Sequence, residues 1–133
     1  MRKICVFLLL TLSFQLFAVD KEIDMNKTIH LAGGCFWGLE KLMQSLKGVK
    51  DATSGYANGD SKENATYKTV CKGETGFRET VKVTYDSSLT TLENLLNAYF
   101  EVVDPTLTNQ QGHDVGPQYQ AGIYYTNDED KQV

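Results

Sequence analysis

The stretch "TIHLAGGCFWGLEKLMQSLKG", residues 28–48, predicts a strand, a tight turn and a helix in succession. Its first five residues form a short apolar strand that runs into Gly33 and Gly34. From Cys35 onward the apolar side chains recur every three or four residues, which is the spacing of one face of a helix. Gly48 is a residue type that commonly follows the last turn of a helix. A cysteine therefore stands at the point where a strand ends and a helix begins.

The rest of the chain continues the alternation of strands and helices. A strand is expected over 49–56, and residues 60–78 are too polar for a core element and predict a long loop. "ETVKVTYD", residues 79–86, alternates apolar and polar side chains, as a half-buried strand does. Thr90 and Glu93 fit a capping box before a helix that extends toward Asp104 and Pro105, and 121–125 is the last strand. The order β-α-β-β-α-β predicts an α+β two-layer sandwich with a ferredoxin-like core and a largely antiparallel sheet.

The first residues have the pattern of a secretory signal peptide. Arg2 and Lys3 precede an apolar run, which predicts a signal peptide over 1–19 and an exported, periplasmic or extracytoplasmic domain over 20–133. An uncleaved signal acting as a membrane anchor is the alternative. Cleavage would change the formal charge from −4 to −6, because both basic residues would be lost. That charge argues against nucleic acid or an anionic membrane as the partner.

Two cysteines, Cys35 and Cys71, lie in the expected mature domain. They could form a disulfide in an oxidising compartment, but one bridge does not make a disulfide scaffold at this length. The sequence has no C-x-x-C pair, and His30 and His113 are far apart, so we expect no metal site and no bound cofactor. A helix start favours the thiolate form of a cysteine, which makes Cys35 a candidate nucleophile. A small buried residue that packs a tight turn is the alternative.

Five blocks of the sequence carry a family resemblance. "GCFWGLE" at 34–40 resembles the signature of the methionine sulfoxide reductase A family. The segments "SGYANG" (54–59), "ATYKTVCKGETGFRETVKVTYD" (65–86), "VDPT" (103–106) and "NQQGHDVGPQYQAGIYY" (109–125) resemble other blocks of that family in the same order. The resemblance extends from about residue 28 to the end of the chain.

The resemblance implies thiol-dependent reduction of the S epimer of methionine sulfoxide, free or in a protein, to methionine, and hence the repair of oxidised proteins. Cys35 matches the nucleophile, which becomes a sulfenic acid, and Glu79 matches the proton donor. Tyr67, Tyr119, Asp114, Phe36 and Trp37 match the substrate-binding residues: the tyrosines bond to the sulfoxide oxygen, Asp114 supports them, and the other two form the methyl pocket.

These residue types suit the chemistry of a sulfoxide. The sulfoxide sulfur is electrophilic, its oxygen accepts hydrogen bonds and a proton, and its methyl group is apolar, so a site needs a thiolate, an acid and an aromatic wall. Glu79 must be protonated at neutral pH to serve as the acid. We therefore expect burial to raise its pKa.

The sequence also departs from the family pattern. Phe77 and Gln110 stand where the family commonly has a histidine and an arginine, which leaves substrate preference open. Relative to the family the chain is expected to be incomplete beyond Val133, where resolving cysteines often lie. Cys71 is interpreted as structural or without an assigned role. We expect an external thiol reductant, either thioredoxin-like or glutathione-type, and a monomer.

Two other functions fit parts of the sequence. A cysteine hydrolase could pair Cys35 with His113 as a thiolate–imidazolium dyad. An inactive fragment could bind methionine sulfoxide or a peptide without turning it over. Glu40, on the predicted helix, has no part in the chemistry implied by the resemblance and is expected to be structural.

Overall fold

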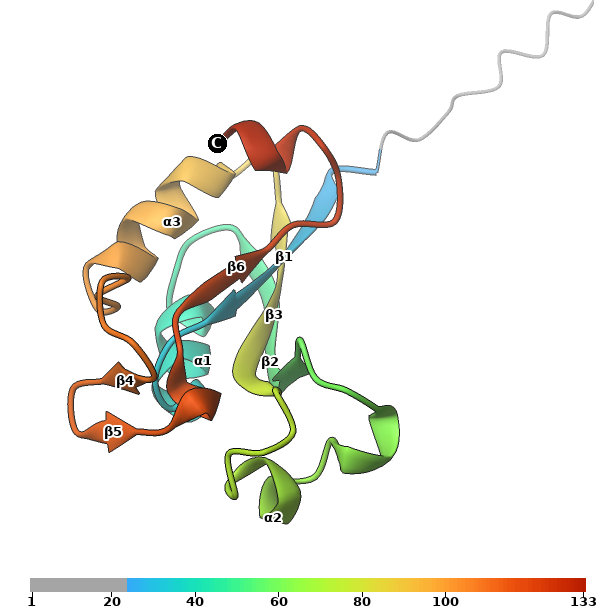
Figure 1. Cartoon of the computed structure of the whole chain (residues 1–133). Coiled ribbons are helices and arrows are strands. Elements are labelled where there is room, and N and C mark those ends of the chain that lie inside the picture. Colours follow the sequence, from blue (N-terminus) through green and yellow to red (C-terminus); the bar gives the residue numbers. More distant parts are fainter. Residues whose placement is uncertain (1–23) are drawn as a thin grey trace, which may run out of the picture.

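A computed structural model describes residues 24–133, and its centre is a four-stranded antiparallel sheet (Figure 1). The sheet contains β1 (Asn26–Ala32), β2 (Val49–Ala57), β3 (Arg78–Asp86) and β6 (Gly122–Tyr124), in the spatial order β2-β3-β1-β6. Every neighbouring pair is antiparallel. This order confirms the ferredoxin-like core expected from the sequence. The expected signal peptide, residues 1–19, lies outside the described residues.

Two helices, α1 (Phe36–Gln44) and α3 (Leu92–Phe100), cover one face of the sheet (Figure 1). Each helix buries apolar side chains at three- to four-residue spacing, and β1 and β3 bury every second residue on the facing side. The core cluster formed in this way includes Ile29, Leu31, Leu39, Met43, Val81, Val83, Tyr85, Leu92, Leu95 and Tyr99. The two layers of the molecule are therefore this sheet and this pair of helices.

The helix ends differ from those expected from the sequence. α1 ends at Gln44, and Gly48 has a φ of +90°, so that glycine serves the turn into β2 and not the end of the helix. α3 ends at Phe100, well before Asp104. The predicted cap at Thr90 is wrong: the side chain of Thr91 accepts the N–H of Asn94 at 3.2 Å. A threonine at either position would have satisfied the sequence rule for helix caps.

The polar segment between β2 and β3 contains two short helical turns. These are η1 (Lys62–Asn64) and α2 (Tyr67–Val70), in a stretch expected to be a loop. α2 forms because Thr66 and Thr69 cap its first turn reciprocally, and Val70 is buried beneath it. The sequence prediction missed α2 because one turn is too short to produce a periodic pattern.

The last third of the chain adds small elements around one end of the sheet. A two-stranded ribbon forms from β4 (Gln110–Gln111) and β5 (Asp114–Val115), and η2 (Pro117–Tyr119) follows it. A 3₁₀ turn, η3 (Asp130–Gln132), lies near the end of the chain. Figure 1 shows the ribbon and α2 at the end of the sheet where α1 begins. Within residues 24–133, no helix has the length and apolar character needed to cross a membrane.

Candidate active site

Cys35 lies between β1 and α1, where packing fixes the backbone on both sides. The hydroxyl of Tyr99 on α3 donates to the carbonyl of Ala32 at 2.7 Å, which holds the end of β1. A Cβ on Gly33 would lie 2.7 Å from a methyl of Val103, so this turn has no room for a side chain. Gly34 has a φ of +72°, and its N–H donates to the carbonyl of Tyr119 at 3.0 Å. The two glycines therefore set the position of the thiol.

Gly38 differs from the other two glycines of the motif. A Cβ built on it meets no atom of the described residues within 4 Å. No contact within residues 24–133 therefore requires a glycine at this position. Glu40 is structural, as expected, because its carboxylate accepts the backbone N–H of Ser54 at 2.8 Å and ties α1 to β2.

Glu79 is the buried acid of the site. It lies on β3 with only 2% of its surface exposed, and its Oε2 accepts the backbone N–H of Phe36 at 3.0 Å. That N–H belongs to the residue after Cys35, so the carboxyl group is held beside the thiol-bearing turn. Burial raises the pKa of Glu79, the N–H of Phe36 opposes the shift, and the charge of Asp114 adds to it. No ion pair within residues 24–133 involves this carboxyl group.

The two aromatic residues after Cys35 lie in different environments. Phe36 is 6% exposed, and its ring centroid is 5.6 Å from that of Tyr56. Trp37 is 65% exposed and stacks on Tyr67 with a centroid distance of 6.3 Å and an interplanar angle of 11°. The expected pocket formed by Phe36 and Trp37 thus consists of a buried ring and an exposed ring, 5.7 Å apart.

Three further predicted residues come from loops and short elements around the thiol. The pKa of Tyr67 is raised. Its interaction with the thiol of Cys71 is the largest cause, and the charge of Cys35 adds to the shift. Burial raises the pKa of Tyr119, and the charges of Glu79 and Asp114 add to this shift. Both phenols are therefore neutral donors at neutral pH. The structure brings all seven predicted site residues to this end of the sheet.

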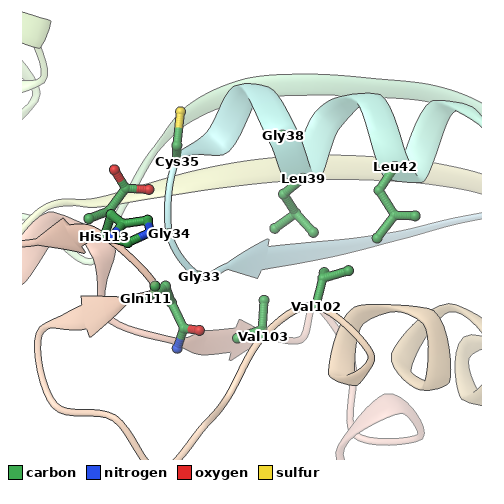
Figure 2. A pocket seen from close by; sticks show the side chains of 12 residues that line it. Gly33, Gly34, Cys35, Gly38, Leu39, Leu42, Val102, Val103, Gln111 and His113 are labelled. Atoms are coloured by element: carbon green, nitrogen blue, oxygen red, sulfur yellow. The ribbon is translucent and has the colours of Figure 1, made fainter.

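A groove of about 600 Å³ lies beside the thiol-bearing turn, between α1 and the segment that follows α3 (Figure 2). In Figure 2, Leu39 and Leu42 on α1 point toward Val102 and Val103, and the sulfur of Cys35 points away from them. The lining residues are Gly33, Gly34, Cys35, Gly38, Leu39, Leu42, Val102, Val103, Gln111, Gly112, His113 and Asp114. Its floor is therefore largely apolar, and its polar residues gather near Cys35.

His113 lies near the thiol but is not paired with it. It lines the same groove as Cys35, yet no hydrogen bond within residues 24–133 joins the two side chains. In Figure 2 the sulfur points away from the imidazole ring. Nothing in this geometry favours the dyad that a cysteine hydrolase needs.

The chain matches the family described as peptide methionine sulfoxide reductase over residues 27–133. It belongs to that family. It is 51% identical over 109 residues to the peptide methionine sulfoxide reductase MsrA of Pasteurella multocida, and 50% identical over 109 residues to that of Lachnoclostridium phytofermentans. Each alignment covers 82% of this chain, but only 62% and 65% of those relatives. The chain therefore spans less than two thirds of the length of these family members.

Solved structures of the family have the same fold. The methionine sulfoxide reductase A of Corynebacterium diphtheriae superposes with a TM-score of 0.76 at 37% identity, covering 82% of this chain and 51% of that one. Reduced Mxr1 from Saccharomyces cerevisiae superposes with a TM-score of 0.75 at 39% identity, covering 81% of this chain and 64% of that one. These superpositions confirm the family fold for the part of the chain that the structure describes.

Several residues around the site were not predicted as functional. Tyr56 and Phe77 form an aromatic contact, with ring centroids 6.2 Å apart, that extends the wall behind Phe36. Gln111 is buried, and its Oε1 accepts the N–H of Asp104 at 2.9 Å, which connects the ribbon to the segment that follows α3. The pairing of Tyr56 with Glu79 across β2 and β3 could have identified Tyr56 as a site residue. Nothing in the sequence marked the contact made by Gln111.

Proposed function

We propose that this protein reduces the S epimer of methionine sulfoxide to methionine, using Cys35 as the nucleophile and Glu79 as the proton donor. The observation that carries the proposal is the carboxyl group of Glu79, buried and bonded to the N–H of Phe36 directly after the thiol. A buried carboxyl group with a raised pKa keeps its proton at higher pH, as a general acid must. Membership of the reductase family supports the same reaction.

The proposed reaction balances in atoms and electrons. The thiolate of Cys35 attacks the sulfoxide sulfur while Glu79 gives a proton to the sulfoxide oxygen. The attack forms a bond between Sγ and the substrate sulfur; the substrate sulfur–oxygen bond then breaks as the hydroxyl oxygen bonds to Sγ, and the Sγ–sulfur bond breaks as methionine leaves, so that the oxygen ends on Cys35 as a sulfenic acid. Two electrons pass from the cysteine to the substrate sulfur.

The remaining site residues bind the substrate in this proposal. The neutral hydroxyls of Tyr67 and Tyr119 donate hydrogen bonds to the sulfoxide oxygen, where negative charge develops. Phe36 and Trp37 contact the methyl group. Asp114, whose charge raises the pKa of both Glu79 and Tyr119, helps to keep these groups protonated.

An external thiol must return Cys35 to its reduced state. Attack by a thioredoxin-like or glutathione-type thiol on the sulfenic acid releases water, and a second thiol then reduces the mixed disulfide. The proposed substrates are free methionine sulfoxide and oxidised proteins, and the proposed role is the repair of proteins under oxidative stress. Cys71 is an exposed free thiol at the end of α2, and this reaction does not require it.

We also infer that the chain is exported and that its first 19 residues are a signal peptide. The pattern of Arg2, Lys3 and the apolar run supports this inference. Intact mass of the protein recovered from the periplasm would give the cleavage position. An unprocessed chain that stays with the membrane fraction would instead indicate an anchor.

The reductase proposal is tested by turnover of the two sulfoxide epimers with dithiothreitol as the reductant. Wild-type protein is expected to convert the S epimer only, and Cys35→Ser is expected to have no activity. His113→Asn is the matched control, since a hydrolase dyad would lose its activity and the reductase would keep most of it. If the wild-type chain binds sulfoxide but releases no methionine even in a single turnover, it is a binding fragment and the proposal is wrong.

A further inference from the structure

Tyr56 lies directly across the sheet from the proposed acid. In the antiparallel pairing of β2 and β3, Tyr56 is the register partner of Glu79. Directly opposed residues of an antiparallel pair project from the same face of a sheet, with Cβ atoms about 4.5–5.5 Å apart. The tyrosine side chain therefore begins beside the buried carboxyl group.

The ring of Tyr56 also contacts the aromatic residues on both sides of that acid. Its centroid is 5.6 Å from that of Phe36, the residue whose N–H donates to Glu79, and the two planes are inclined at 43°. On its other side it meets Phe77 edge-on at 6.2 Å. Phe77 in turn fills the space over Gly59, where a Cβ would lie 2.2 Å from the ring. Tyr56 is thus the central ring of a wall that extends from α1 to the loop before β3.

We propose that Tyr56 is a positioning residue that keeps the carboxyl group of Glu79 dry and protonated. This inference rests on the proposed reductase function and adds to it the residue that tunes the acid. The ring acts through Phe36 and through its place opposite Glu79 and need not touch the substrate. Removing it would let water reach the carboxyl group from the β2 side.

The charges around Glu79 leave burial as the main influence on its protonation. Asp114, from the ribbon, raises its pKa, and the N–H of Phe36, from α1, lowers it. Tyr56, Tyr67 and Tyr119 face it from β2, α2 and η2 as neutral phenols. Burial is the largest cause of the raised pKa of Tyr56 and Tyr119, and the charge of Glu79 adds to the shift of all three. The neighbouring cation, Arg78, donates to the carbonyl of Ala121 at 3.2 Å, on the opposite side of the strand. A change at Tyr56 therefore acts chiefly through solvation.

The first measurement is the pH dependence of sulfoxide reduction for Tyr56→Ala and Tyr56→Phe. Loss of the ring is expected to lower the midpoint of the alkaline limb by about one pH unit, because a hydrated carboxyl group releases its proton sooner. Tyr56→Phe keeps the ring and should retain the wild-type midpoint. Tyr125→Ala, which removes an exposed tyrosine near the end of β6, is the matched control and should also leave the midpoint unchanged.

The second measurement does not depend on activity. Titration of the full chain with ¹³C-labelled glutamate carboxyls, followed by NMR, gives the pKa of Glu79, with Glu79→Gln assigning its signal. Tyr56→Thr introduces a β-branched residue, which suits a strand, and serves if Tyr56→Ala does not fold. A downward shift in either variant supports the proposal, and an unchanged Glu79 midpoint in a folded variant overturns it. If the wild-type chain does not reduce sulfoxide, the reductase proposal fails, and the titration still decides the role of Tyr56.

Discussion

Phe36 and Trp37 are neighbours in the sequence, but one is 6% exposed and the other 65%. Phe36 points into the core and packs on Tyr56, whereas Trp37 lies at the surface and stacks on Tyr67. Successive residues of a helix are separated by about 100°, so a helix that begins at the site presents its second residue to a different environment. The thiol is thus flanked by a buried inner wall, to which Phe36 belongs, and an exposed outer wall, to which Trp37 belongs.

The two walls also differ in what supports them. The inner wall is formed by Phe36, Tyr56 and Glu79, which belong to α1, β2 and β3. The outer wall depends on Tyr67, in the single turn of α2, and on the exposed face of Trp37. Regular elements fix side chains through many shared contacts, while short surface segments open at lower free energy. We therefore expect the inner wall to be preformed and the outer wall to adapt to the substrate.

The strongest test of the inner wall is Glu79→Ala. Removing the proposed proton donor is expected to lower kcat/KM for the proposed substrate, methionine sulfoxide, by about 10²–10⁴-fold, the usual contribution of a general acid. Wild-type activity should also fall as pH rises through the raised pKa of Glu79, since the deprotonated form cannot donate. Steady-state kinetics from pH 5 to 10 measure both effects. If Glu79→Ala shows the same loss of activity at high pH as the wild type, another group donates the proton.

The pair Phe36→Ala and Trp37→Ala compares the two walls directly. Phe36→Ala is expected to cost about 3–5 kcal/mol of unfolding free energy, because it leaves a cavity in the core. Trp37→Ala should change stability by no more than about 0.5 kcal/mol, as substitutions at exposed positions usually do. The main effect of Trp37→Ala should instead be a higher KM for the sulfoxide, because the exposed ring is proposed to contact the substrate. Urea denaturation and initial rates of both variants test the comparison, and equal stability losses would contradict it.

Much of the inner wall could be predicted from the sequence, and less of the outer wall. The alternation of residues 79–86 placed Glu79 on a strand, and helical spacing placed Phe36 at a helix start, so the secondary structure of both positions was predicted correctly. Periodicity could not show that Trp37 and Tyr67 stack, because the loop that carries Tyr67 has no repeating pattern. Their contact depends on tertiary folding of residues 58–77. The shift of the helix cap from Thr90 to Thr91 has a similar cause, since two adjacent threonines satisfy one local rule.

The buried acid should also be visible in the pH dependence of stability. The folded-state pKa of Glu79 is raised above its ordinary value of 4.5, so the unfolded chain releases this proton first as pH rises. The unfolding free energy of the wild type should therefore fall relative to Glu79→Gln above about pH 4.5, and the difference should level off once the folded carboxyl also ionises. Denaturation of both proteins from pH 4 to 9 measures the difference. A wild type that gains stability relative to Glu79→Gln over this range would mean that the carboxylate is stabilised in the fold.

The smallest expected effect is at Cys71, on the outer side of the site. Its thiol is exposed and is the largest cause of the raised pKa of Tyr67, so Cys71→Ser keeps a polar group of similar size next to that phenol. Dithiothreitol-dependent turnover is expected to stay within about twofold of wild type, as for an exposed substitution outside the reacting groups. Cys71→Ala removes that polar group and should act on KM more than on kcat, because Tyr67 belongs to the adaptable wall. A large loss of kcat in Cys71→Ser with unchanged single-turnover release of methionine would instead assign Cys71 to the reduction of the sulfenic acid.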